Sequence, residues 1–256
     1  MVQQYFADVE RLGFDHQPSE DIVQGVRMNP HWIGLLTMAF AHAQAADPGT
    51  DYSDVVHAYY ASYVLRGPPA FDQASRGAAR RHPWSISEYA YLSLTASVCA
   101  RFFNNDAARA ALEKAVGVLL GCQSDQGHFP SEHYETPDAP NLVDLVYTQN
   151  WATLGLLHAA RVLGDSACGK AVDRSLELLA GIQDTSAQPW LAGCWRGLYD
   201  VATGRWGGGD LSEGGANSIY SGWTNAPIAL AFLFSATGES LFAEEGEERT
   251  TPAAGR

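Results

Sequence analysis

The chain has 256 residues, of which 46% are hydrophobic and 18% charged. A chain of this size and composition can bury one sizeable core, which excludes a disordered or fibrous protein. Acidic residues outnumber basic ones by 29 to 16, for a formal net charge of −13. A surface of this sign repels phosphate backbones, so we expect no nucleic-acid partner.

Membrane insertion and a metal site are not expected either. No apolar run approaches the ~20 residues that cross a bilayer. The first residues lack the basic and apolar regions of a signal peptide, which predicts a cytoplasmic protein unless an export signal precedes the sequence given. The cysteines show no CxxC pair and no Cys/His ligand spacing, so we expect free thiols, no metal and no cofactor. These cysteines are Cys99, Cys122, Cys168 and Cys194.

Apolar residues recur at helical spacing over most of the chain, and strand-like alternation is scarce. This pattern predicts an all-α domain over residues 1–243, followed by an acidic disordered tail over 244–256. Gly/Pro/Asp-rich stretches predict loops at 67–83, 123–143 and 184–221. The predicted helices cover about 31–46, 51–66, 84–103, 106–122, 146–163, 166–183 and 222–237.

The chain contains an internal repeat. Residues 101–123 align with 161–183 at an offset of 60, and both copies end in a leucine, a glycine and a glutamine at matching positions. In each copy an apolar helix is followed by a short turn and an amphipathic helix, which predicts an inner and an outer helix. Repeated helical hairpins are typical of α/α solenoids and toroids. We expect Asp106 and Asp165 to be the N-caps of the outer helices.

Four of the seven tryptophans lie near predicted starts of inner helices, each beside polar residues: Trp32, Trp84, Trp151 and Trp223. If the hairpins stack around an axis, these starts gather at one end of the inner helices. That arrangement predicts an aromatic cup fringed by hydroxyls, amides and unpaired helix N–H groups. The alternative is that each tryptophan packs in the core at the end of its helix.

Residues 190–227 hold four tryptophans, a triple glycine and the carboxylates Asp200, Asp210 and Glu213. Flat aromatic faces stack on sugar rings, and two carboxylates that face a sugar are what glycosidic cleavage needs. The glycines at 207–209 permit a close approach of a ligand to the backbone. The alternative is that Asp210 caps a turn and that Glu213 is a solvated loop acid.

Three runs in this region carry a family resemblance: GCWRGLYD, GRWGGGD and SIYSGWTNAPIA. Over roughly residues 188–235 the chain resembles the C-terminal hairpin region of glycoside-hydrolase-like proteins of the six-hairpin, or (α/α) toroid, glycosidase superfamily. The superfamily includes lyases, epimerases and non-catalytic members, so the resemblance implies the fold more strongly than the activity. Six hairpins would need about 360 residues. The chain supplies about four, which predicts a fragment, a partial ring or a ring completed by other chains.

The sequence therefore predicts a protein that binds a carbohydrate and processes it by acid/base chemistry. We expect Asp210 or Glu213 to be the general acid or base, Asp200 a second carboxylate, and Arg196 a partner for a uronate. Trp206, Tyr220 and Trp223 would form the stacking platform. The other expected substrate contacts are Trp84, Glu88, Trp151, Asn217 and Thr224.

Two other readings of the sequence stay open. One is a non-catalytic helical-hairpin module whose aromatic surface contacts a partner chain, and the other is a terpenoid-binding toroid with an apolar cavity. A partial ring exposes apolar flanks at both ends, so we expect a dimer or higher oligomer.

Two further motifs lie in the loop that follows residue 122. The run QSDQGHF (123–129) resembles the QxxxGxF/W turn of class II terpene cyclases and prenyltransferase β subunits, although the DxDD acid motif of the cyclases is absent. The neighbouring group His128, Glu132, His133 and Glu135 lacks the HExxH register of a metal site. We interpret it as part of a solvated loop.

Overall fold

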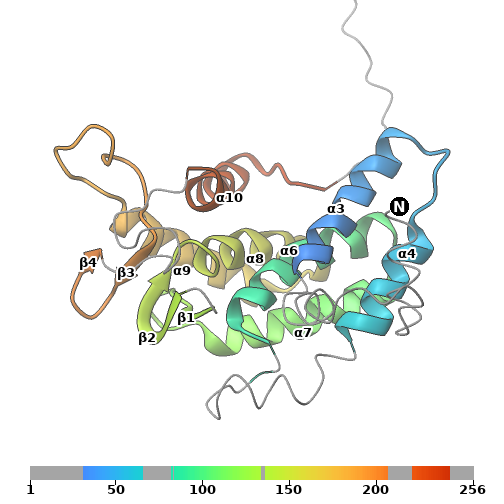
Figure 1. The fold of residues 1–256 in the computed structure, drawn as a ribbon, viewed down its shortest axis with the longest axis horizontal. Helices are drawn as coiled ribbons and strands as arrows, with labels where there is room; N and C mark the ends of the chain where they lie inside the picture. The colour runs from blue at the N-terminus through green and yellow to red at the C-terminus, as the bar shows by residue number, and fades with distance from the viewer. Residues whose placement is uncertain (1–30, 66–81, 83, 134–135, 207–220, 243–256) are drawn as a thin grey trace, which may run out of the picture.

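The computed structural model describes residues 31–65, 82, 84–133, 136–206 and 221–242, and most of them are helical (Figure 1). The α-helices are α3 (His31–Ala46), α4 (Ser53–Ala58), α6 (Ile86–Phe102), α7 (Asp106–Cys122), α8 (Gln149–Leu163), α9 (Ser166–Ile182) and α10 (Ala226–Thr237). Two π-helical segments, η1 (Tyr59–Val64) and η2 (Ser221–Asn225), adjoin α4 and α10. Each helix predicted from the sequence is confirmed to within a few residues.

The expectation of an all-α chain is wrong in one respect, because the structure contains a small antiparallel sheet. Its strands are β1 (Pro130–His133), β2 (Thr136–Asp144), β3 (Leu198–Asp200) and β4 (Arg205–Trp206), in the order β1-β2-β3-β4. Apart from Asp144 at the end of β2, all four fall in stretches predicted to be loops. Two strands are too short to show alternation, and the β1–β2 pairing is irregular, with two register shifts. The period-two pattern that reveals a strand in a sequence is therefore missing.

The helices divide into buried and amphipathic ones, as the repeat predicts. Every residue of α6 from Ile86 to Ala100 is buried. In α7 and α9 the buried residues instead recur at spacings of three and four along one face. This is the pattern of a helix that covers a core and turns its other side to solvent. Hence α6 and α8 are inner helices, and α7 and α9 are outer helices.

The inner helices lie side by side in chain order. Helix α6 packs between α3 and α8, and α8 packs between α6 and α10 (Figure 1). The α6–α8 contact is close because Gly155 has no side chain: a Cβ at this position would overlap Ser93 Oγ and come within 3.0 Å of the Leu94 nitrogen. None of the described helices is long and apolar enough to cross a membrane.

The N-caps of the outer helices are partly as predicted. Asp165 caps α9 and accepts a hydrogen bond from Ala167 N (2.8 Å). For α7, however, the prediction of Asp106 is wrong by one residue: Asn105 is the cap, and its Oδ1 accepts a hydrogen bond from Ala108 N (3.0 Å). Both residue types serve as N-caps, so the two adjacent candidates cannot be told apart from the sequence.

The repeat extends beyond the helices into the turn that follows α7. Gln123 donates from Nε2 to the carbonyl of Gly127 (3.2 Å). The N–H of Gly127 in turn donates to Ser124 O (2.9 Å). Gly127 has φ +90°, a conformation that favours glycine. The N–H of Phe129 then donates to Gln149 Oε1 at the start of α8 (2.9 Å). The turn thereby ties an outer helix to the next inner helix.

The turn that follows α9 repeats these bonds. Gln183 donates from Nε2 to the carbonyl of Gly193 (2.7 Å), and Gly193 N donates to Asp184 O (2.7 Å). Gly193 has φ +83°. The N–H of Trp195 donates to Asn225 Oδ1 at the start of α10 (2.8 Å). The two turns therefore share a glutamine, a left-handed glycine and an aromatic residue bound to the next inner helix.

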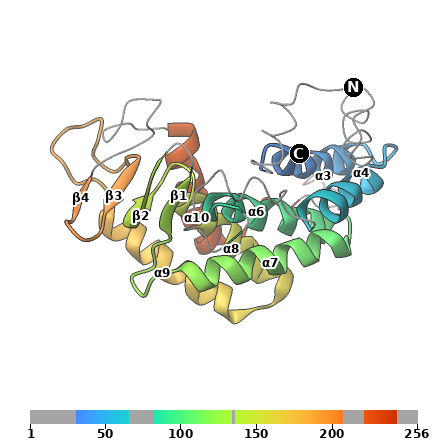
Figure 2. The ribbon, with the colours of Figure 1, turned by 60° about the horizontal axis from the view of Figure 1, so that its bottom comes forward.

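Each turn leads into a two-stranded hairpin. The β1–β2 hairpin follows α7, the β3–β4 hairpin follows α9, and β2 pairs with β3 through Leu142–Asp200 and Asp144–Leu198. Figure 2 shows the four strands together at one side of the molecule. The sheet therefore joins two successive repeats near the ends where α8 and α10 begin.

Candidate functional site

Three aromatic rings meet where the inner helices begin. Tyr91 lies on α6, Trp151 on α8 and Trp223 on η2. The ring centroids are 5.0 Å apart for Tyr91–Trp151, 5.2 Å for Trp151–Trp223 and 6.2 Å for Tyr91–Trp223. We call these three residues the aromatic cluster. Two of the four tryptophans predicted to gather at helix starts thus lie together.

The aromatic cluster runs from the core to the surface. Tyr91 is buried, Trp151 is half-buried, and Trp223 is 37% exposed. Two buried polar atoms beside it, Trp151 Nε1 and Thr224 Oγ1, have no hydrogen-bond partner among the described residues. Both atoms are closed to solvent, and each buried polar group left without a partner costs about 1–3 kcal/mol.

Asn150 fixes the position of Trp223. Its Nδ2 donates to the carbonyl of Trp223 (2.8 Å) and to that of Val146 (3.1 Å), while its Oδ1 accepts from Trp151 N (2.9 Å). The side chain is fully buried. One amide thus joins the backbone at the start of α8 to the backbone of η2, the two segments that carry Trp151 and Trp223.

Trp84 and Glu88, both expected to contact substrate, are buried near the start of α6. Trp84 is 1% exposed, and its ring packs against Tyr89 (5.8 Å between centroids) and lies 5.4 Å from Lys114 Nζ. For Trp84 the core-packing alternative therefore describes the structure. Glu88 is also 1% exposed and lies in the first turn of α6, where a carboxylate interacts favourably with the helix dipole.

Asp200 holds the turn between β3 and β4. Its Oδ1 accepts hydrogen bonds from Ala202 N (2.8 Å) and Thr203 N (3.2 Å). These bonds, the one from Ala202 above all, keep the pKa of Asp200 below its ordinary value. Trp206 on β4 packs edge-on against Tyr199 (5.1 Å between centroids), so its ring belongs to the sheet.

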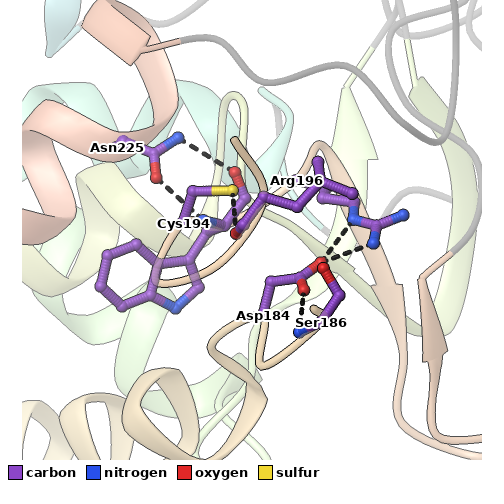
Figure 3. Close-up of polar contacts among 7 residues, drawn as sticks. Asp184, Ser186, Cys194, Arg196 and Asn225 are labelled. Atoms are coloured by element: carbon purple, nitrogen blue, oxygen red, sulfur yellow. Dashed lines mark hydrogen bonds and ion pairs between the residues drawn. The ribbon is translucent and has the colours of Figure 1, made fainter. Parts of the chain in front are cut away.

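Arg196 forms an ion pair within the turn that follows α9 (Figure 3). Its Nε and Nη2 lie 2.8 Å and 2.5 Å from Asp184 Oδ2. Burial acts to raise the pKa of Asp184, but the hydrogen bonds from Ser186 N–H and Arg196 outweigh it, and the pKa is lowered. The guanidinium expected to bind a uronate thus already holds a carboxylate of its own chain.

Four predicted site residues lie outside the described residues: Asp210, Glu213, Asn217 and Tyr220. The segment that contains them, 207–220, leads directly into η2, which carries Trp223.

His128 is not part of a solvated loop, as the sequence was interpreted, because it is 7% exposed. Its Nδ1 lies 2.7 Å from Ser124 Oγ and its Nε2 lies 2.9 Å from Pro140 O. Since the carbonyl can only accept, Nε2 donates this bond. Within the described part of the chain, no three His, Cys, Asp or Glu side chains lie close enough to hold a metal ion.

No protein-family model matches the chain, and no curated protein is detectably similar to it in sequence.

Proposed function

We propose that this protein binds a carbohydrate on the aromatic cluster and processes it by carboxylate acid/base chemistry. The observation that supports this function best is the convergence of Tyr91 on α6, Trp151 on α8 and Trp223 on η2. An exposed indole offers a flat apolar face to the C–H groups of a sugar ring. Within the described part of the chain, Trp151 Nε1 and Thr224 Oγ1 are unpartnered but buried, so a sugar hydroxyl would reach them only after neighbouring side chains move.

We also propose that the architecture is an open arc of an α/α toroid. Four inner helices, α3, α6, α8 and α10, follow one another as neighbours, and α7 and α9 lie outside them. The repeated turn and hairpin after α7 and α9 support the same view, because a toroid is built from one unit used several times. In such an arc the inner-helix starts line one end, where the aromatic cluster lies.

For the chemistry we propose Asp210 and Glu213 as the pair of carboxylates. Asp200 is committed to its turn through two backbone N–H groups, which makes it the weakest of the three candidates. Glu213 lies ten positions before Trp223 in the sequence. One carboxyl would protonate the leaving oxygen while the other acts as base or nucleophile, with their separation deciding the stereochemistry.

Replacing Trp223 with alanine should weaken sugar binding about tenfold or more, because the variant loses the apolar face against which the sugar ring is buried. The measurement is isothermal titration against a panel of neutral and uronate-containing oligosaccharides. The control is Leu65→Ala, since Leu65 has the same 37% exposure and lies on the chain far from η2. The Leu65→Ala variant should bind each oligosaccharide with the affinity of the wild type.

Replacing Asp210 with asparagine or Glu213 with glutamine should abolish turnover while leaving sugar binding largely intact. The sequence predicts a loop for both acids, and loop acids on a surface contribute little to folding, so we expect each variant to stay within about 1 kcal/mol of the wild-type stability. The measurement is product release from the oligosaccharide that binds best. Wild-type turnover in both variants would show that neither carboxylate takes part.

A second candidate function is a helical-hairpin module that assembles with a partner, and α10 is the observation that favours it. Ala226, Ala229 and Leu233 on this helix are exposed, and Leu233 is 47% exposed. No residue from Ala226 to Thr237 carries a charge, although the chain as a whole has a net charge of −13. If no sugar in the panel binds the wild type, this function replaces the first.

A further inference from the structure

Trp190 is the most exposed of the large hydrophobic side chains in the described residues. It is 71% exposed, against 37% for Trp223 and 47% for Leu233. It lies in the turn between α9 and β3, next to Leu191, and its ring stacks on no other aromatic ring of the described residues. An indole kept in water on a surface is a candidate for contact with another molecule.

The turn that carries Trp190 is held rigid by backbone and side-chain bonds. Leu191 N and Ala192 N both donate to Gln188 O (2.9 Å each), and Cys194 Sγ donates to Leu191 O (2.8 Å). At the base of the turn, Asp184 N donates to Cys194 O (3.0 Å). The Asp184–Arg196 pair closes the same base (Figure 3). The indole is therefore presented on a preorganised support, which lowers the entropy lost on binding.

The turn is also electrically neutral. Asp184 and Arg196 are the only charged residues between positions 184 and 196, and they neutralise each other. The guanidinium already binds a carboxylate, and a chain with a net charge of −13 disfavours the approach of anions. These charges favour an uncharged molecule over a uronate or another polyanion.

The turn and the aromatic cluster belong to one hydrogen-bonded unit. Trp195 N donates to Asn225 Oδ1 (2.8 Å), and Asn225 Nδ2 donates back to Trp195 O (3.0 Å). Figure 3 shows this pair of bonds beside the base of the turn. The chain runs from Trp190 to Trp195, crosses these bonds to Asn225 and continues to Trp223. Since consecutive Cα atoms are ~3.8 Å apart, the Cα atoms of Trp190 and Trp223 are at most roughly 35 Å apart.

We propose that Trp190 is a second stacking platform and that the ligand is a neutral polysaccharide long enough to contact both Trp190 and the aromatic cluster. This inference rests on the proposed function. A protein partner would need a patch of many residues around a central aromatic anchor. A sugar ring needs only one flat aromatic face, and the exposed indole of Trp190 on its uncharged turn offers one. A chain held at two points also gains affinity from the second contact without any change at the first.

The test compares polymers with short oligosaccharides of the same sugar. Wild type, Trp190→Ala, Trp190→Phe and the control Leu65→Ala are titrated with xyloglucan, galactomannan and dextran, with a trisaccharide of each, and with polygalacturonate. We expect Trp190→Ala to weaken binding of the preferred neutral polymer about tenfold and to leave the affinity for its trisaccharide unchanged. Trp190→Phe should restore most of the lost affinity. Polygalacturonate should bind no variant.

Equal affinity of wild type and Trp190→Ala for the polymer would overturn the inference, as would tight binding of polygalacturonate. A change of oligomeric state in Trp190→Ala would also overturn it, because the indole would then contact protein. If Trp223→Ala still weakens binding of the trisaccharide while Trp190→Ala changes no affinity, the proposed function stands and only this inference fails. If Trp190→Ala weakens binding of the polymer while Trp223→Ala changes no affinity, the proposed site is wrong, and so is the inference that one polysaccharide contacts both places. Absence of any binding overturns both.

Discussion

Replacing Gly127 with alanine should lower the free energy of unfolding by more than about 3 kcal/mol. Gly127 has φ +90°, which an L side chain rarely adopts, and a Cβ there would overlap the backbone carbonyl of Arg174. The backbone cannot shift freely, because the carbonyl of Gly127 accepts bonds from Gln123, Gln149 and Ser175 (3.2, 3.0 and 3.2 Å). Strain and lost hydrogen bonds therefore act together.

Urea unfolding measures this effect, and Gly117→Ala is the matched control. Gly117 is exposed in the middle of α7, and a Cβ there meets nothing within 4 Å. Because alanine favours the helix, the control should be more stable than wild type by about 0.5–1 kcal/mol. A stability of Gly127→Ala within 1 kcal/mol of the wild type would show that the turn after α7 does not organise the repeat.

This turn also shows what the run QSDQGHF does in the protein. The sequence indicated a resemblance to a terpene-cyclase turn, and in the structure Gln123, Gly127 and Phe129 join α7 to α8. Phe129 is fully buried, and Gln123 binds Ala171 O of α9 through Nε2 (2.9 Å). The motif therefore has a packing role, and it carries no argument about terpenoid chemistry.

The helices could be predicted because each inner and outer helix carries its own local signal. In α9 the apolar positions Cys168, Val172, Leu179 and Ile182 recur with the helical period, and Asp165 marks the start. The internal repeat then separated inner from outer helices, since an inner helix such as α6 is covered on all sides and shows no single apolar face.

The sheet and half of the site depend on contacts between distant residues, which no local pattern reveals. Asp184 and Arg196 are twelve positions apart, and nothing in their types distinguishes a partner within the turn from a ligand. Tyr91 lies inside an apolar helix and was missed. Its position in the sequence, about one turn after the start of α6, is the signal that could have indicated it. The face of α6 that carries Tyr91 also contacts α8.

The last large effect concerns His158, a buried histidine on α8 that binds the segment after α10. Its Nδ1–H donates to Leu154 O (2.8 Å), so that Nε2 is free to accept a hydrogen bond from Leu241 N (2.9 Å). The rings of Phe234 and Phe242 pack edge-on against the imidazole (5.9 and 5.2 Å between centroids). Only the neutral imidazole can accept the bond from Leu241.

The charged groups around His158 also favour its neutral form. Arg161 on α8 binds the carbonyls of Glu239 and Phe234 (2.5 and 3.2 Å), and Arg101 on α6 lies 4.4 Å from the ring centroid of Phe242. Burial first, with a further contribution from Arg161, lowers the pKa of His158 from 6.5 to about 4. The imidazole of the folded protein should therefore stay uncharged at every pH above about 4.

Acidification should accordingly destabilise the protein between pH 6.5 and pH 4. In this window the unfolded chain takes up a proton on His158 and the folded protein does not, so the free energy of unfolding falls as the pH is lowered. A pKa shift of this size amounts to about 3 kcal/mol. In His158→Gln this part of the pH dependence should disappear from urea unfolding curves, whereas replacement of the exposed His42 by glutamine should preserve it. Parallel pH profiles for wild type and His158→Gln, or an NMR titration of His158 near pH 6.5, would show that the imidazole is not held neutral and that Leu241 is not tied to α8 in this way.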